Sequence, residues 1–376
     1  MSQQIISSSN QYESLDSWIK SNNIRKLFLV CDSSLKFLKN ISEKLDSMEK
    51  DSEYILEIIR FDDFQPNPLY DSVVKGVRLY RESGCNAIMA IGGGSAMDVA
   101  KCIKLYSNMN SDGSDGAFLN IPIVANDVPF LAMPTTAGTG SEATRFAVVY
   151  YDGKKQSVAD ISAIPSTVLM DSSVLVTLPE YQKKSTMMDA FCHSIESFWS
   201  VNSTEESKTY SRQAIRLIID NLDGYLGNTE EGNKNMLIAA NLAGKAINIT
   251  QTTAGHAMCY KLTSLYGTAH GHSAILCDRV LLPWMLENTD KCIDSRGEDY
   301  LRSVFHEIAE AMGCDTPEAA ADKVEEIFKR LELDIPTAKE EDYAVLKTSV
   351  NPVRLKNHPI ALDEETIDML YHRILK

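Results

Sequence analysis

The order of apolar and polar positions changes near residue 180. Before that point, short apolar runs alternate with stretches in which apolar residues recur every three or four positions. Such runs are typical of buried strands, and the longer spacing is typical of amphipathic helices. We predict strands over residues 26–32, 87–93, 130–135 and 167–171, and helices over residues 69–83 and 95–107. Because strands alternate with helices, this half is predicted to be an α/β domain with a parallel, Rossmann-like sheet.

Strand patterns disappear after residue 180. Long helical periods follow, over residues 204–224, 230–250, 297–312, 316–331 and 363–375. A chain of 376 residues also exceeds the usual size of a single hydrophobic core. We therefore expect two domains, residues 1–180 and 181–376, of which the second is all-helical. Within the first domain, residues 146–160 are expected to form a β-hairpin that turns at Asp152-Gly153.

The charge balance argues against one class of partner. Asp and Glu outnumber Lys and Arg by 52 to 37, which gives a formal net charge of −15. A surface of this sign repels nucleic acid, so we expect no nucleic-acid partner, and an anionic substrate would need a local basic pocket. The eight cysteines contain no CxxC pair, which favours reduced thiols.

Apolar runs are too short for a membrane span, which needs roughly 18 residues. The first residues, MSQQIISSSNQYESLDSW, also contain neither the basic region nor the apolar core of a secretory signal. We therefore expect no membrane association and a cytoplasmic location.

Two glycine- and hydroxyl-rich stretches follow predicted strands. In AIGGGSAMDVAK, Gly93 and Gly94 precede Ser95, and the spacing of Ser95 and Asp98 predicts a capping box at the helix start. Glycines let phosphate oxygens approach the backbone, and a helix N-terminus attracts them. PTTAGTGSEAT, residues 134–144, is the second stretch. Either one alone could be a tight turn, but two in one sheet favour a pyrophosphate-binding site.

Asp32 ends the first predicted strand. A carboxylate there accepts hydrogen bonds from the adenosine ribose of a dinucleotide and repels a 2′-phosphate, which predicts a preference for NAD(H) over NADP(H). A solvated aspartate in a turn is the alternative.

Three of the seven histidines lie within residues 255–272. His256 and His270 are fourteen residues apart, about 21 Å on an unbroken helix, so we predict that Gly267 ends one helix and lets the chain turn back. Asp189 and His193 lie four residues apart on one helical face. One carboxylate and three imidazoles suit Fe(II), Zn(II), Co(II) or Mn(II), so we predict that the four groups converge on one divalent metal.

These stretches together resemble the iron-containing alcohol dehydrogenase family. The motifs that carry the resemblance are GGGSAMDVAK, MPTTAGTGSEAT, MDAFCHSIES, GHAMCYKLTSLYGTAHG and NPVRLKNHPIAL. The resemblance implies a nucleotide-binding domain, a helical metal-binding domain, and hydride transfer in a cleft between them, with Fe(II) as the expected metal and Zn(II) as the alternative. It assigns the metal to Asp189, His193, His256 and His270. It assigns the cofactor phosphates to Gly93, Gly94, Ser95, Thr135 and Thr136, and places Lys155 near the cofactor.

One position departs from the pattern of this family. Many members have a further histidine four residues after the third ligand, where this chain has Tyr260. Proton delivery could use Tyr260, His272, the cofactor ribose or water. A pocket-wall aromatic is the alternative role of Tyr260.

Polar residues surround these motifs. Arg145, Lys245, Thr252 and Lys261 are predicted substrate contacts, because cations and hydroxyl donors bind phosphate-like groups. Surface solvation could explain any one of them. Within the family, TRFAVVYYDGKKQSV and GKAINITQTTAGHAMCYKLTSLYG resemble members that reduce phosphonoacetaldehyde to 2-hydroxyethylphosphonate. We therefore expect a small, anionic aldehyde substrate and a homo-oligomer.

Three other functions remain open at this point. A dehydrogenase of the same family could act on a simple alcohol or a polyol. A related fold uses NAD in phosphate elimination and cyclisation. A non-catalytic nucleotide-binding protein is the third alternative, and it predicts eroded metal positions, whereas all four positions are filled here.

Overall fold

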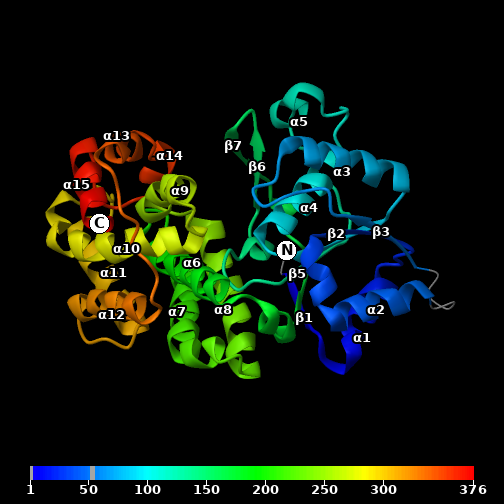
Figure 1. Cartoon of the computed structure of the whole chain (residues 1–376), viewed down its shortest axis with the longest axis horizontal. Coiled ribbons are helices and arrows are strands. Elements are labelled where there is room, and N and C mark those ends of the chain that lie inside the picture. The colour runs from blue at the N-terminus through cyan, green and yellow to red at the C-terminus, as the bar shows by residue number, and fades with distance from the viewer. Residues whose placement is uncertain (1–2, 51–55) are drawn as a thin grey trace. The chain divides into compact units, whose positions relative to one another are not determined.

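The structure is a computed structural model that describes residues 3–50 and 56–376. The chain divides into two compact units (Figure 1). One unit comprises the chain up to Thr136 together with Gly140–Leu178, and the other comprises Ala137–Thr139 and Pro179–Lys376. The predicted division between residues 180 and 181 lies two residues beyond the main observed one.

A parallel sheet forms the centre of the first unit. Its described strands follow the order β1-β8-β5-β4-β2-β3, and every neighbouring pair is parallel. The strands are β1 Gln4–Ser7, β2 Lys26–Cys31, β3 Glu57–Phe61, β4 Ala87–Gly92, β5 Phe130–Pro134 and β8 Thr167–Met170. Residues of β4 and β5 are buried at every position, so both faces of the sheet are covered, as parallel sheets require.

The helices of this unit bear out the predicted α/β class. They are α1 Ser9–Ser21, α2 Lys39–Lys50, α3 Tyr70–Ser83, α4 Gly94–Ser107 and the short α5 Ala117–Asn120. Side chains of α3 and α4 pack with β2, β4 and β5 in one apolar core that includes Phe28, Val77, Ile88, Ile103 and Phe130. The four predicted strands and two predicted helices are confirmed, and each differs from its predicted range by one residue at one end.

The strand order reverses beside β2. From β2 the chain leads to β3 on one side, and it then crosses to β4 on the other side. In open α/β sheets, ligands bind beyond the carboxyl ends of the strands at such a switch point. Asp32 follows β2 and Gly93 follows β4, so two predicted cofactor residues lie at this point.

The start of α4 differs from the prediction. The predicted capping box between Ser95 and Asp98 is wrong, because Gly93 is the N-cap and no side chain caps the helix. Asp98 instead accepts hydrogen bonds from the Ser141 hydroxyl at 2.9 Å and the Val148 amide at 3.0 Å. These partners lie far away in sequence, so a tertiary contact replaces the local one.

Lys101, one turn further along α4, is completely buried. Its ammonium donates to the Ser141 carbonyl at 2.6 Å and to the Phe146 carbonyl at 2.7 Å. The hydroxyls of Ser141 and Thr144 accept from it at 3.0 and 3.1 Å. Burial lowers the pKa of Lys101 to about 8, although Asp98 and Glu142 oppose the shift. This ammonium holds the end of the threonine-rich loop against α4.

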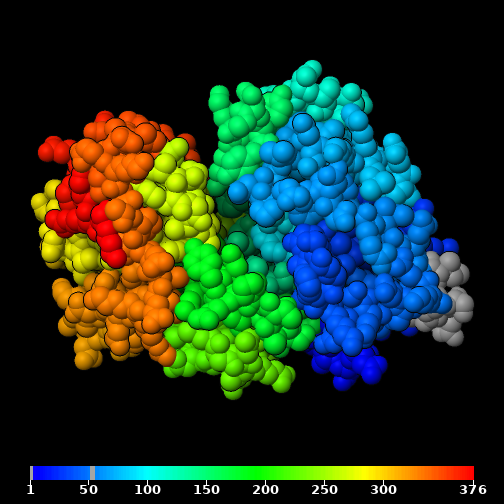
Figure 2. Space-filling model, viewed as in Figure 1, coloured from blue at the N-terminus to red at the C-terminus, as the bar shows by residue number. Residues whose placement is uncertain are grey.

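The predicted hairpin is confirmed. β6 Phe146–Tyr151 pairs antiparallel with β7 Lys154–Ala159. Asp152 and Gly153 join the strands with φ angles of 50° and 68°, and a two-residue type I′ turn requires positive φ at both positions. Figure 2 shows the hairpin, in green, at the surface of this unit.

The second unit is helical, as predicted. Its helices are α6 Glu180–Trp199, α7 Glu205–Leu226, α8 Glu230–Thr250, α9 Ala254–Tyr266, α10 His270–Glu287, α11 Glu298–Ala311, α12 Pro317–Arg330, α13 Glu340–Thr348, α14 Pro352–Leu355 and α15 Glu364–Ile374. Thr204, Thr316 and Asp363 cap α7, α12 and α15 through their side chains. Among the residues that the structure describes, no helix is long and apolar enough to cross a bilayer.

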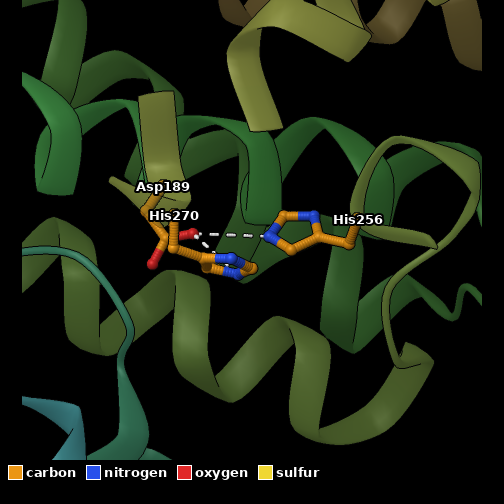
Figure 3. A group of neighbouring side chains, drawn as sticks. All are labelled: Asp189, His256 and His270. Carbon is orange, nitrogen blue, oxygen red and sulfur yellow. Dashed lines mark hydrogen bonds and ion pairs between the residues drawn. The ribbon is translucent and has the colours of Figure 1, made fainter. Parts of the chain in front are cut away.

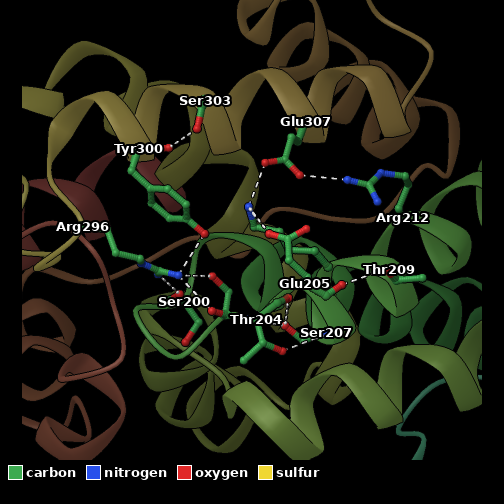
Figure 4. A network of polar contacts seen from close by, with 12 residues as sticks. Ser200, Thr204, Glu205, Ser207, Thr209, Arg212, Arg296, Tyr300, Ser303 and Glu307 are labelled. Carbon is green, nitrogen blue, oxygen red and sulfur yellow. Dashed lines mark hydrogen bonds and ion pairs between the residues drawn. The ribbon is translucent and has the colours of Figure 1, made fainter.

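Polar contacts close the turn between α6 and α7 (Figure 4). Arg296 donates to the Ser200 carbonyl and to the Tyr300 hydroxyl, each at 2.9 Å. Lys208, buried on α7, donates to Glu307 of α11 at 2.8 Å. The Arg296 contact anchors the end of α6, the helix that carries two predicted metal ligands, and the Lys208 contact joins α7 to α11.

Candidate active site

Helix α6 presents three polar side chains on one buried face. Asp189, His193 and Glu196 follow a spacing of four and then three residues, which places them along one side of a helix. All three are buried, with exposed fractions of 2%, 6% and 0%. Buried ionisable groups are stable only with partners, so this face indicates a site rather than an apolar core.

Two further imidazoles come from α9 and α10. His256 is in the first turn of α9, and His270 is the first residue of α10. Gly267 follows α9 with a φ of 68°, the left-handed conformation that ends helices and favours glycine. The predicted helix break at Gly267 is therefore confirmed.

The three imidazoles surround one oxygen atom, Oδ1 of Asp189. The Nε2 atoms of His256, His193 and His270 lie 3.4, 3.8 and 3.9 Å from it. Figure 3 shows His256 and His270 pointing toward this carboxylate. Ligand atoms of Asp189, His256 and His270 all lie within 4.8 Å of one another. His193 is outside that group, but its ring stacks on His256 with centroids 4.5 Å apart.

The donor set fits a divalent cation. Four ligands at about 2.1 Å in tetrahedral geometry lie roughly 3.4 Å apart, close to the spacings around Asp189. Those spacings exceed the ordinary hydrogen-bond length of about 2.7–3.2 Å. Imidazole nitrogen and carboxylate oxygen suit Fe(II) and Zn(II).

The electrostatics of Asp189 and His193 agree with this set. Burial alone would raise the pKa of Asp189, but His193, His256 and His270 together hold it below its usual value. Burial lowers the pKa of His193 to about 4, against the opposing influence of Asp189. Asp189 is thus an anion and His193 is neutral near pH 7, the forms that bind metals.

Glycines beside the histidines allow this close packing. A Cβ atom at Gly271 would lie 2.0 Å from the Ser185 carbonyl oxygen and 2.7 Å from Cβ of Asp189. A Cβ atom at Gly255 would lie 1.9 Å from Oδ1 of Asp278. The glycines of AGHAM and AHGHS therefore let α9 and α10 approach their neighbours.

Glu196 contacts His256 and was not predicted. Its carboxylate meets Nδ1 of His256, the ring nitrogen opposite the one that faces Asp189. It also accepts from the His256 amide at 3.0 Å. The spacing along α6 from Asp189 is a signal that could have identified Glu196.

The predicted cofactor residues gather at the carboxyl ends of neighbouring strands. The Thr135 amide donates to the Gly92 carbonyl at 3.0 Å, and a Cβ atom at Gly93 would lie 3.4 Å from the Thr136 side chain. A Cβ atom at Gly92 would lie 3.6 Å from a carboxylate oxygen of Asp32.

The remaining predicted cofactor residues lie at the start of α4, on β7 and directly after β2. Gly94 and Ser95 form the first turn of α4, where backbone amides are open to an anion. Lys155 is exposed on β7. The second carboxylate oxygen of Asp32 accepts from the Ser34 amide at 2.7 Å. The glycine and threonine loops thus lie side by side.

Tyr260 and His272 differ in their surroundings. The Tyr260 ring stacks on His270, with centroids 5.7 Å apart and planes 8° apart. His272 is buried, and its ring nitrogens contact the Asp334 carbonyl at 2.8 Å and the Tyr181 hydroxyl at 3.0 Å. Both ring nitrogens of His272 thus have partners within the fold, whereas the Tyr260 ring lies against a predicted metal ligand. Which of the two delivers a proton stays a prediction.

The predicted substrate residues belong to both units. Arg145 lies at the base of the hairpin, over the Phe146 ring at 4.9 Å. Lys245, Thr252 and Lys261 belong to α8, the α8–α9 junction and α9. Their convergence with Arg145 on one substrate stays a prediction.

Comparisons with known proteins place the chain among related enzymes. Aldehyde-alcohol dehydrogenase 2 of Entamoeba histolytica is 31% identical over 334 residues, 82% of this chain and 38% of that protein. Phosphonoacetaldehyde reductase of Streptomyces viridochromogenes is 30% identical over 80% of this chain and 79% of that protein. This chain spans only 31–38% of the length of the aldehyde-alcohol dehydrogenases that it matches.

A solved structure shares the fold. Sulfoacetaldehyde reductase of Bifidobacterium kashiwanohense, in complex with NAD+, superposes with a TM-score of 0.86 at 24% identity, over 99% of this chain and 96% of that one. Residues 2–172 match the family model of iron-containing alcohol dehydrogenases, and residues 183–375 match the model of the C-terminal part of that family. The chain belongs to the iron-containing alcohol dehydrogenase family.

Proposed function

We propose that this chain is a metal-dependent, NAD(H)-linked reductase that converts a small aldehyde to a primary alcohol. The observation that carries the proposal is the approach of three imidazole nitrogens to one buried carboxylate oxygen. Support also comes from the glycine and threonine loops, which lie next to each other at the carboxyl ends of β4 and β5. A non-catalytic nucleotide-binding protein would have no reason to keep these four groups together, three of which are buried.

Asp189, His193, His256 and His270 would hold the metal, with Fe(II) favoured by the family and Zn(II) as the alternative. A divalent cation supplies Lewis acidity, which polarises an aldehyde carbonyl and stabilises negative charge on its oxygen. Burial of Asp189 and His193 excludes water from their side of the site and strengthens this electrostatic effect. Tyr260, stacked on His270, is the proposed proton donor to the product oxygen.

The nicotinamide cofactor would supply the hydride. Gly93, Gly94 and Ser95 would accept its phosphates at the N-terminus of α4, with Thr135 and Thr136 on the neighbouring loop. Asp32, at the switch point, would accept hydrogen bonds from the adenosine ribose and disfavour a 2′-phosphate. The chain should therefore prefer NADH to NADPH.

An anionic aldehyde, phosphonoacetaldehyde above all, is the favoured substrate. Its support is the 30% identity to a phosphonoacetaldehyde reductase and the presence of Arg145, Lys245, Thr252 and Lys261 in a chain of net charge −15. Such a chain gains nothing from its global field and needs local cations for an anion. Reduction of an uncharged aldehyde is the second candidate, favoured by the similarity to an aldehyde-alcohol dehydrogenase.

A substrate panel tests this proposal. Metal-reconstituted protein is assayed for NADH oxidation with phosphonoacetaldehyde, propanal and a polyol-derived aldehyde, and metal-free protein serves as the control. We expect turnover that depends on metal and a kcat/KM highest for phosphonoacetaldehyde. A preference for propanal would contradict the anionic substrate, and turnover without metal would contradict the metal-dependent reaction.

A further inference from the structure

Helix α9 begins without a cap of its own. Thr253, its N-cap residue, makes no side-chain hydrogen bond to the first turn of the helix. The open amides of a helix start need acceptors, and a buried start without them is costly. Glu196, on α6, provides these acceptors from outside the helix: its carboxylate accepts from the amides of Thr253 and His256.

The same carboxylate is held rigidly. The Thr253 hydroxyl donates to Oε2 of Glu196 at 2.6 Å, and the Trp199 indole donates to that hydroxyl at 2.8 Å. Glu196 is completely buried. A Cβ atom at Gly255 would lie 2.8 Å from Oε1 of Glu196, so glycine leaves room for the carboxylate. Each oxygen of Glu196 therefore has a defined position.

Oε1 of Glu196 meets Nδ1 of His256. A carboxylate accepts and does not donate, so Nδ1 carries the proton in this contact. In a neutral imidazole the lone pair then lies on Nε2, the atom that faces Oδ1 of Asp189. Glu196 thereby selects the form of His256 that offers Nε2 as a ligand.

We propose that Glu196 is a positioning residue that anchors the start of α9 and fixes His256, in orientation and tautomer, as an Nε2 metal ligand. The inference rests on the metal site of the proposed function. Helix α6 would then supply two ligands directly, Asp189 and His193, and orient a third. Carboxylates that accept from the outer nitrogen of a ligand histidine typically raise metal affinity by 10- to 100-fold.

The variant Glu196→Gln tests this role. Its amide nitrogen cannot accept, so one of the donors on His256 or Thr253 loses its partner. We expect zinc affinity, measured by competition with a chromophoric chelator, to fall about 10- to 100-fold. Ser194→Ala is the matched control, because the Ser194 hydroxyl donates within α6, to the Ala190 carbonyl at 2.8 Å. Its zinc affinity should equal that of the unmutated protein.

The unmutated protein provides a second readout, which stands even if Glu196→Gln does not fold. In the zinc-loaded form, the ¹H–¹⁵N NMR spectrum of labelled histidines should show His256 protonated at Nδ1. Protonation at Nε2, or unchanged zinc affinity in folded Glu196→Gln, would overturn the positioning role. An unmutated protein that binds no zinc or iron would instead overturn the proposed function.

Discussion

The two units bury charge in opposite ways. In the first, the ammonium of Lys101 is surrounded by four oxygens at 2.6–3.1 Å, each within hydrogen-bond distance. In the second, the carboxylate oxygen of Asp189 faces three imidazole nitrogens at 3.4–3.9 Å, beyond good hydrogen-bond distance. The charge of Lys101 is satisfied by hydrogen bonds within the fold, whereas the imidazole nitrogens around Asp189 lie too far from its oxygen for good hydrogen bonds.

This difference distinguishes a buried charge with a structural role from a candidate metal site. A buried charge whose donors all have acceptors needs no further partner. Buried acceptors that converge without donors are costly unless a cation joins them. Lys101 and Asp189 are both buried, so the burial of the central charge does not distinguish the two clusters. The distances between the polar atoms do.

Loss of a ligand in the Asp189 cluster should have the largest effect. In His270→Ala, we expect no retained metal and a fall in kcat on the order of 1000-fold, because Lewis-acid stabilisation supplies several kcal/mol. Metal analysis and NADH oxidation measure both. His372→Ala, which removes a partly exposed imidazole on α15, is the control and should change neither. Full metal content in His270→Ala would contradict the ligand assignment.

Loss of the charge in the Lys101 cluster should affect stability instead. In Lys101→Met we expect about 3–5 kcal/mol less free energy of unfolding, measured with denaturant, and unchanged metal content. Lys75→Met removes an exposed lysine and should cost under about 1 kcal/mol. Metal loss in folded Lys101→Met would remove the distinction between the clusters.

The stability difference between the unmutated protein and Lys101→Met should depend on pH. The pKa of Lys101 is about 8 in the fold against 10.5 for an ordinary lysine, so the unfolded chain binds more protons between these values. The stability of the unmutated protein, relative to Lys101→Met, should therefore rise from about pH 8 to pH 10.5. A relative stability that falls over this range would show that Lys101 is not desolvated.

Arg145 offers a test of the substrate's charge. In Arg145→Ala we expect kcat/KM for phosphonoacetaldehyde to fall roughly 10- to 100-fold, since a charge-assisted contact contributes about 1.5–3 kcal/mol. The value for propanal should change far less. Arg302→Ala removes an exposed arginine and serves as the control. Equal losses for both aldehydes would assign Arg145 to the cofactor or the fold.

Asp32 should give the smallest effect. Asp32→Gly removes the repulsion between this carboxylate and the 2′-phosphate of NADPH, which is worth about 1 kcal/mol. We therefore expect the ratio of kcat/KM for NADH to that for NADPH to fall roughly fivefold. Steady-state kinetics with both cofactors measures this ratio. Equal kcat/KM for both cofactors in the unmutated enzyme would contradict a role for Asp32 in selection.

Central elements of the fold could be predicted from apolar pattern, and edge elements could not. β4 and β5 are buried at every position, and this burial produces the continuous apolar runs that predicted them. β1 and β3 lie at the edges of the sheet, with mostly exposed or alternating positions, and were not predicted. An edge strand contacts one neighbour only, so its sequence carries a weaker signal.

Part of the candidate site could likewise be predicted from the sequence, and part could not. Spacing along single helices predicted the Asp189–His193 pair and the break at Gly267, because these features depend on local geometry. The role of Asp98 and the contact of Glu196 depend on which segments meet in space. Neither the Ser141–Asp98 bond nor the uncapped start of α9 could be inferred from local spacing.

One measurement tests the central claim most directly: anomalous diffraction at the iron edge from crystals of the iron-reconstituted protein. The account predicts a single peak per chain, bonded at about 2.1 Å to Oδ1 of Asp189 and to Nε2 of His193, His256 and His270. A peak bound by other residues, or a peak from which the Asp189 carboxylate is absent, would contradict it.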